Sequence, residues 1–362
     1  MKKYADFYKI KTATPQSFFI GANTKSGFQR TALSLCNESE LTRLYIIKGG
    51  PGTGKSTIMK SCAKTANNSG ADITYLFCSS DPDSLDGIII SKGTVKLAVT
   101  DGTHPHTADS SLPGCCGEII DCGIGWDSSK LAIRRDDIAT ESARKSICFE
   151  RGYAYLSAAD KIKTTVQRSA MRYTDHSKMS DAIKRMIKAL PKQKSPYFES
   201  ICTTEAISMV GGVRLSTFEN STSLIAVKEF ASISPIFFET LAQELRKSGR
   251  SQEISVSPMG DICEIRLPLA DISFVPFRDG MVYTKVFQLK NFIICSSESE
   301  CRGKRKFNEK CYSEMIYSAS DSFSEAKLHH FTLEEIYRSA MDFSAINKLS
   351  TELCDKISFL IK

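Results

Sequence analysis

A glycine-rich segment between an apolar run and a helical pattern constrains the fold of this chain more than any other feature. The apolar run, Leu44 to Ile47, favours a buried strand, and the helical pattern runs from Thr57 to Ala66. Glycine permits positive φ angles and has no Cβ, so such a segment can wrap backbone N–H groups around a phosphate at a helix N-terminus. The sequence therefore predicts a phosphate-binding loop. The loop consists of Gly49, Gly50, Pro51, Gly52, Thr53, Gly54, Lys55 and Ser56, followed by Thr57.

This segment matches the P-loop pattern G-x-x-x-x-G-K-[ST] at every position. Lys55 is expected to reach the β- and γ-phosphates of a nucleoside triphosphate, and the Ser56 hydroxyl to ligate Mg²⁺. We expect ATP as the nucleotide, although the lack of an N-K-x-D-type guanine motif is the sole argument in the sequence against GTP. The alternative interpretation is an ordinary glycine-rich turn between a strand and a helix.

A second acidic ligand for Mg²⁺ is expected at the end of a neighbouring buried strand. Asp101 follows the apolar run Val95 to Val99 and is our candidate for this role; an Asp that starts a turn before Gly102 is the alternative. His104 and His106 come directly after it, where ligands bind in open α/β sheets. We prefer His106 to orient the attacking water or contact the γ-phosphate, against a solvated loop histidine.

A further acidic segment follows the expected second strand, Ile73 to Cys78. Asp81 or Asp83 is a candidate to assist Mg²⁺ or to bind a second substrate. The same Asp-Pro-Asp-Ser sequence is also typical of a turn and a helix cap, and we favour that interpretation.

Residues 102–127 contain several glycines and are a candidate mobile lid. Glu118, Trp126 and Asp127 would be its polar and aromatic contacts. Neither Arg134 nor Arg135 is identified as an arginine finger, because a charged helix face explains both equally well.

Three ordered matches indicate that the chain contains two copies of one unit. They are Leu44–Lys48 with Leu224–Lys228, Asp101-Gly102 with Asp279-Gly280, and Arg168–Met171 with Arg338–Met341. The distance in sequence between the paired segments shrinks slightly from the first match to the last, which is what small deletions produce.

The second copy is expected to have lost the phosphate chemistry. When the match of Lys48 with Lys228 is extended without a gap, an acidic side chain replaces the first motif glycine and a proline, which has no N–H donor, replaces the lysine. We therefore expect a structural or regulatory role for this half. The replacements are Glu229 for Gly49, Ser234 for Gly54, Pro235 for Lys55 and Ile236 for Ser56.

These patterns predict an α/β fold of the P-loop NTPase type, with a mainly parallel sheet in two tandem copies, each followed by a helical segment. Residues 1–190 form the expected nucleotide-binding domain with its helical extension. A polar, proline-bounded linker follows, Pro191 to Pro196. Residues 197–362 form the expected degenerate domain with C-terminal helices.

Composition is that of an ordinary globular protein, with 41% hydrophobic and 25% charged residues and a net charge of +7. No apolar run approaches the ~20 residues that span a bilayer, so no membrane partner is expected. The mild basic charge suits phosphate ligands, but no basic block indicates nucleic acid. The thirteen cysteines include no CxxC pair, which favours a reducing cytoplasm over a disulfide framework. The cluster Cys115, Cys116 and Cys122 leaves a zinc site as a minor alternative.

Three sequence segments together resemble a bacterial family of tandem P-loop ATPases. They are Lys48 to Thr57, Cys78 to Gly87, and Asp101-Gly102-Thr103 with Pro105-His106. The resemblance covers residues 16–160 in detail and is diffuse beyond. It implies nucleotide binding and an ATPase-type fold; family members often carry two intact loops, from which this chain departs at residues 229–236.

The first functional hypothesis is therefore an ATP-binding protein that hydrolyses ATP with Mg²⁺. Lys55, Asp101 and His106 would be its catalytic residues, and Ser56 and Asp101 its metal ligands. A small-molecule kinase and a nucleotide-gated binding module with little turnover are the alternatives, with an unidentified small-molecule or protein partner.

Overall fold

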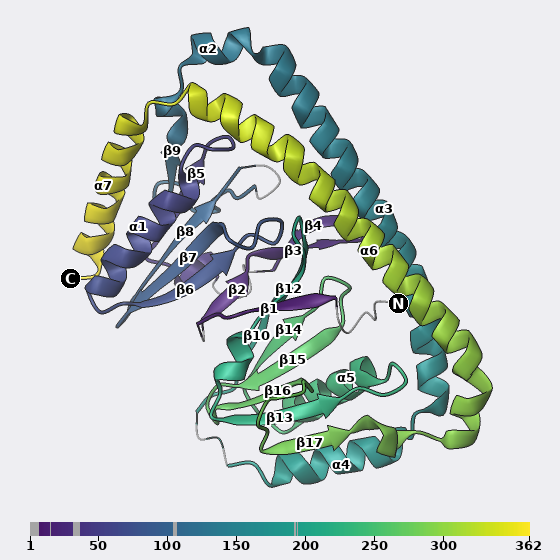
Figure 1. Cartoon of the computed structure of the whole chain (residues 1–362). Helices are drawn as coiled ribbons and strands as arrows, with labels where there is room; N and C mark the ends of the chain where they lie inside the picture. The colour runs from purple at the N-terminus through teal and green to yellow at the C-terminus, as the bar shows by residue number, and fades with distance from the viewer. Residues whose placement is uncertain (1–6, 15, 32–36, 104–106, 192, 194) are drawn as a thin grey trace.

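Two α/β lobes and a pair of long helices outline a triangle in the computed structural model of this chain (Figure 1). The structure describes residues 7–14, 16–31, 37–103, 107–191, 193 and 195–362. Each lobe contains a six-stranded mixed sheet, and the two sheets have the same strand order. The predicted α/β fold with two tandem P-loop-like units is confirmed.

The first sheet has the strand order β2-β6-β7-β8-β5-β9. Three of its neighbouring pairs are parallel, and the pairs that β7 makes are antiparallel. The strands are β2 (Ser17–Phe19), β5 (Arg43–Lys48), β6 (Asp72–Phe77), β7 (Leu85–Lys92), β8 (Val95–Asp101) and β9 (Gly117–Asp121).

The second sheet repeats this arrangement in the order β10-β14-β15-β16-β13-β17. Its β15 is again antiparallel to both neighbours, and its other pairs are parallel. The strands are β10 (Glu199–Cys202), β13 (Ser223–Lys228), β14 (Gln252–Val256), β15 (Ile262–Leu267), β16 (Ile272–Pro276) and β17 (Lys285–Gln288).

Two smaller sheets lie between the lobes. The N-terminal strand β1 (Tyr8–Lys11) pairs in parallel with β12 (Gly211–Leu215) of the second half, which also pairs with β11 (Glu205–Ser208). A hairpin of β3 (Gly21–Thr24) and β4 (Gly27–Arg30) is the counterpart in the first half. Short 3₁₀ turns lie at Glu38–Glu40 (η3), Cys122–Gly125 (η4), Thr217–Asn220 (η5) and Leu289–Phe292 (η6).

The helix that follows β5 in the first lobe, and the helix that follows β13 in the second, each pack against the sheet of their lobe. These helices are α1 (Lys55–Asn68) and α5 (Ser234–Lys247). Their buried residues recur at the same positions relative to the helix start, so the same face meets the sheet in both lobes. The two sets are Ile58, Met59, Cys62, Ala63 and Ala66 in α1, and Phe237, Phe238, Leu241, Ala242 and Leu245 in α5.

The long helices α3 (Arg135–Tyr173) and α6 (Cys295–Ser339) pack side by side (Figure 1). Each of them leads from one lobe to the other, so the helix that follows it packs in the opposite lobe. The short helix α2 (Ser128–Ile133) leads into α3. Helix α3 leaves the first lobe, and α4 (His176–Lys188) then packs on α5 in the second core. Helix α6 runs the other way, and α7 (Phe343–Leu360) packs on α1 in the first core. The predicted sequence boundaries at 190 and 197 stay a prediction, but each core includes a helix from the other half of the sequence.

The two crossing points have the same hydrogen bonds. Asp342 N donates to Gly125 O at 2.7 Å and Asp127 N to Ala340 O at 2.8 Å. In the second lobe Asp175 N donates to Phe292 O and Ile294 N to Tyr173 O, both at 2.8 Å. The structure thus equates Tyr173 with Ala340. The expected match of Arg168–Met171 with Arg338–Met341 is therefore wrong by three residues, close to one helical turn.

In the part of the chain that the structure describes, no helix is long and apolar enough to cross a membrane. The cytoplasmic location expected from the sequence stays a prediction.

Candidate phosphate-binding site

The glycine-rich loop joins β5 to the first turn of α1, as the sequence predicts. Gly52 and Gly54 have φ angles of 69° and 87°, a region that other residues avoid, so these two glycines allow the loop to turn. The Thr53 hydroxyl donates to Gly50 O at 2.9 Å and stabilises the turn. The N-terminus of a fourteen-residue helix is therefore aimed at the space above the loop.

Lys55 lies against the loop itself. Its Nζ donates to Gly49 O at 3.1 Å and Gly50 O at 2.8 Å, and lies 3.7 Å from Asp101 Oδ2. Both charged side chains are largely buried, so this pair is poorly screened. The ammonium group is thus held next to the space where the helix N-terminus points.

Asp101 ends β8 directly beside the strand that leads into the loop. Ile47 of β5 is its partner in the parallel register. The Asp101 carboxylate accepts a hydrogen bond from Thr103 N at 2.7 Å, and the Thr103 hydroxyl donates to Gly49 O at 2.7 Å. The strand end and the loop are therefore tied together, which brings Asp101 and Lys55 to one site as the sequence indicated.

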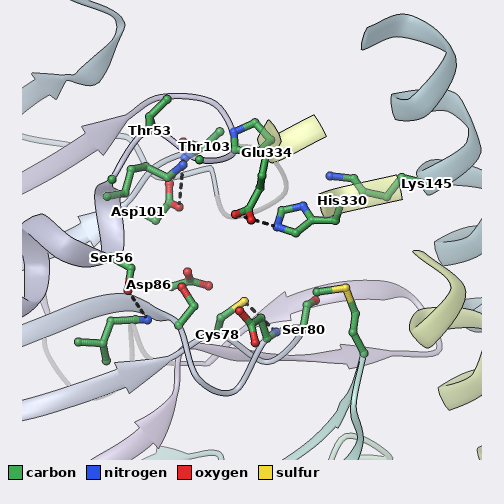
Figure 2. A pocket seen from close by; sticks show the side chains of 18 of the residues that line it. Thr53, Ser56, Cys78, Ser80, Asp86, Asp101, Thr103, Lys145, His330 and Glu334 are labelled. Carbon is green, nitrogen blue, oxygen red and sulfur yellow. Dashed lines mark hydrogen bonds and ion pairs between the residues drawn. The ribbon is translucent and has the colours of Figure 1, made fainter. Parts of the chain in front are cut away.

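A cavity of about 1060 Å³ opens above the loop. Its wall includes the loop residues from Pro51 to Thr57, together with Asp101 and Thr103. Helices α3 and α6 form the opposite wall, and Met209 of the second half also contributes. Figure 2 shows Ser56, Asp86 and Asp101 around the same space. This cavity is the candidate site.

Asp86 is a cavity residue that sequence reasoning did not select. It lies at the start of β7, beside Asp101: the neighbouring residues Gly87 and Thr100 are paired, and the Thr100 hydroxyl donates to Asp86 O at 3.3 Å. The side chain is buried and faces the cavity (Figure 2). The sequence does indicate the strand that positions Asp86, because Ile88, Ile89 and Ile90, which follow Gly87, form an apolar run typical of a buried strand.

The two candidate acids of the segment after β6 have different positions. Asp81 lines the cavity. Asp83 lies outside it, and Lys11 Nζ is 2.6 Å from its carboxylate. The hydrogen bond from Lys11, with the lysine's charge, lowers the pKa of Asp83. Asp83 is therefore a partner of the N-terminal strand β1, which excludes it from the candidate site.

The oxygen ligands at the cavity suit Mg²⁺. Ser56 offers a hydroxyl, and Asp86 and Asp101 offer buried carboxylates. The Ser56 oxygen also accepts a hydrogen bond from Leu85 N at 3.1 Å, which fixes the side chain toward β7. The described residues contain no cluster of three or more histidine, cysteine or acidic side chains able to hold a metal alone.

The cysteine cluster does not form a zinc site. Cys115 is exposed and Cys116 and Cys122 are buried, and Cys122 packs in the hydrophobic core of the first lobe. Cys116 Sγ points to Glu38 O and Leu41 O, at 3.8 and 3.6 Å.

Helix α6 lies directly over the loop, and the sequence did not predict this contact. A Cβ added to Gly52 would lie 2.9 Å from Glu334 O, and one added to Gly50 would lie 3.2 Å from the Tyr337 ring. Tyr337 also packs on Trp126, with ring centroids 6.0 Å apart. The loop therefore contacts a helix that belongs to the other half of the sequence, and no local pattern encodes that contact.

The helical wall carries charged side chains. His330 Nε2 lies 3.5 Å from Glu334 Oε1, and the hydrogen bond with His330 lowers the pKa of Glu334 against the opposing effect of burial. Lys145 of α3 lies on the same side of the cavity (Figure 2). Burial lowers its pKa, the positive charge of Lys55 adds to the effect, and Glu334 opposes it. Arg338 lines the cavity one turn beyond Glu334.

The remaining wall is aromatic. Phe28 of β4 and Phe149 and Tyr153 of α3 line it. Tyr153 donates to Asn23 Oδ1 at 3.2 Å, and burial raises its pKa to about 12. The cavity thus has one charged part at the loop, with both lysine and carboxylate side chains, and one aromatic part between the halves.

The candidate lid, the two arginines and the two histidines have separate outcomes. The proposed lid is wrong for residues 117–125: β9 is the edge strand of the sheet and continues into η4. Glu118 pairs with Lys356 of α7 at 2.5 Å, and Asp127 caps α2 by accepting from Lys130 N at 3.1 Å.

Arg134 pairs with Asp137 at 2.6 Å, and neither it nor Arg135 lines the cavity. His104 and His106 lie outside the described residues, so the role of His106 stays a prediction.

The second loop holds its own carboxylate. Glu229 accepts hydrogen bonds from Ile233 N at 3.1 Å and Ser234 N at 3.0 Å, at the start of α5. An internal acidic group thus binds the N–H groups that a phosphate would otherwise bind.

The residue correspondence of this loop differs from the expected one. The loop is one residue shorter than the first, so aligning the buried faces of α1 and α5 pairs Lys55 with Ser234 and Ser56 with Pro235. Phe277 N donates to Val227 O as Gly102 N does to Ile47 O, so Pro276, and not Asp279, corresponds to Asp101. Both the lysine and the second acid are missing from this loop.

Residues 28–89 match the family model described as Nephrocystin 3, N-terminal, a region related to P-loop NTPases. The match covers β4 to most of β7 and includes the loop, Ser56 and Asp86. No curated protein and no solved structure matches the chain. Residues 28–89 are therefore similar to an NTPase-associated region.

Proposed function

We propose that this protein binds Mg-ATP at the first loop and hydrolyses it to ADP and phosphate. The observation that supports this most is that Lys55, Ser56 and Asp101, which come from two separate segments of the sequence, meet at one cavity next to a helix N-terminus. The similarity of residues 28–89, which include the loop, to an NTPase-associated region also supports it.

In this proposal the loop N–H groups and Lys55 bind the phosphates. Lys55 exchanges its hydrogen bonds to Gly49 O and Gly50 O for charged phosphate oxygens, which are stronger acceptors. Ser56 and Asp101 would hold Mg²⁺, which would supply positive charge for the phosphates. Asp86 would be a further oxygen acceptor beside that site, and His106 would orient the attacking water.

Phosphate transfer to a small molecule is the second candidate function. The cavity extends beyond the loop to Phe28, Phe149, Tyr153 and Met209, and this aromatic part offers room for an acceptor. Transfer of the γ-phosphate to an added metabolite with little phosphate release would favour it over hydrolysis.

The test is binding of Mg-ATP and release of phosphate by the wild type, Lys55→Ala and Lys60→Ala. Lys60 is an exposed lysine on the same helix and lies outside the cavity wall, so it is the matched control. We expect Lys55→Ala to lose about 10–100-fold in affinity, from about 1.5–3 kcal/mol of charged hydrogen bonding. Lys60→Ala should behave as the wild type. No binding by the wild type ends the proposal.

A further inference from the structure

Lys145 is a cation that faces another cation across the cavity. It comes from α3, on the side opposite Ser56 and Asp101 (Figure 2). Burial lowers the pKa of Lys145, and the positive charge of Lys55 lowers it further. Among the described residues no carboxylate forms an ion pair with Lys145, although Glu334 is near enough to act on it electrostatically. The wall of the same cavity also includes the carboxylates of Asp81, Asp86, Asp101 and Glu334, so lysines and carboxylates around one space suit a polyanion that brings its own divalent cation.

The wall behind Lys145 connects both halves of the chain. Lys145 and Glu334 belong to α3 and α6, which pack against each other along their length. The backbone of α6 at Glu334 touches the loop at Gly52. At its other end α3 leads into α4, which is part of the second core. Lys145 therefore belongs to the helix that leads from this cavity to the second lobe.

We propose that Lys145 donates hydrogen bonds to the γ-phosphate and so lets the helix pair distinguish ATP from ADP. This inference rests on the proposed function and names its regulation. A lysine at the γ-phosphate stabilises charge as the bond from the attacking water oxygen to phosphorus forms and the bond to the β-phosphate oxygen breaks. Lys145 keeps its protons throughout; the water proton leaves with phosphate. Loss of the γ-phosphate frees Lys145, and α3 moves away from the loop.

The experiment compares Lys145→Ala with Lys161→Ala, an exposed lysine on the same helix outside the cavity. Affinities for Mg-AMPPNP, a non-hydrolysable triphosphate, and Mg-ADP are measured by calorimetry. We expect Lys145→Ala to bind AMPPNP about 10-fold more weakly than the wild type, because one charged hydrogen bond is lost. Its affinity for ADP should stay within about 2-fold of the wild-type value. Lys161→Ala should match the wild type for both nucleotides, and Lys145→Arg should recover part of the difference.

Hydrogen exchange gives a second readout that a merely structural role of Lys145 would not change. In the wild type, AMPPNP but not ADP should protect residues 142–150 of α3 and 328–338 of α6, and Lys145→Ala should abolish the difference. Should this variant fail to fold, Lys145→Gln takes its place. Unchanged AMPPNP affinity, or equal losses for both nucleotides, would overturn the inference while the nucleotide site stands. A wild type that binds neither nucleotide overturns the proposed function instead.

Discussion

Replacing Gly52 by alanine tests the contact between the loop and α6. The added Cβ would lie 2.9 Å from Glu334 O, and the residue has a φ of +69°. A positive φ costs a non-glycine residue about 1–2 kcal/mol, and forcing an extra carbon into a packed contact costs about 1–3 kcal/mol. We expect Gly52→Ala to lose about 2–5 kcal/mol of unfolding free energy in the first lobe.

Gly70→Ala is the matched control for this measurement. Gly70 has a φ of +76°, and no described heavy atom lies within 4 Å of its added Cβ, so this variant carries the backbone strain without the contact. Urea unfolding can be followed by the fluorescence of Trp126, the single tryptophan, which packs on Tyr337 at this junction. Equal losses for Gly52→Ala and Gly70→Ala would refute the packing of α6 on the loop.

Two further predictions concern the helix pair and a buried acid. A Cβ on Gly152 of α3 clashes with the Phe323 ring of α6, so Gly152→Ala should lose about 1–3 kcal/mol of unfolding free energy, measured with urea. The control is Gly303→Ala, whose added Cβ has no described atom within 4 Å and which should gain about 0.5–1 kcal/mol. A gain in both variants contradicts the helix contact. Burial raises the pKa of Glu264 from 4.5 to about 7, so the folded state keeps the proton over a pH range in which the unfolded chain has lost it. The contribution of Glu264 to the free energy of unfolding therefore falls as pH rises between those two values. Glu264→Gln should remove that fall, on the order of 3 kcal/mol, in urea unfolding at pH 5 and pH 8; an unchanged pH dependence contradicts it.

Sequence reasoning succeeded where the signal is local. The loop, the strand before it and the helix after it are encoded in one short continuous segment, and Asp101 follows its own apolar run. The same reasoning detected the degenerate second loop, because Glu229 and Pro235 contradict the chemistry that the first loop needs. Its residue correspondence failed by one position, because the deletion lies inside the loop and the strand match does not reveal it.

The rest depends on contacts between distant segments. Helical periodicity predicts that α6 has a buried face, but not that Glu334 and Tyr337 cover the loop of the other half. The exchange of α4 and α7 between the cores is invisible for the same reason. Asp86 was missed because Asp-Pro-Asp-Ser directed attention to a turn, whereas β7 starts at Leu85, the residue before it.

The central claim is that one of two related loops binds a nucleotide, and the stoichiometry of Mg-ATP binding tests it most directly. Calorimetric titration of the full chain should give one site per chain in the wild type and a site weakened about 10–100-fold in Lys55→Ala, with no second site in either. Two sites per chain, or undiminished binding by Lys55→Ala, would contradict the account.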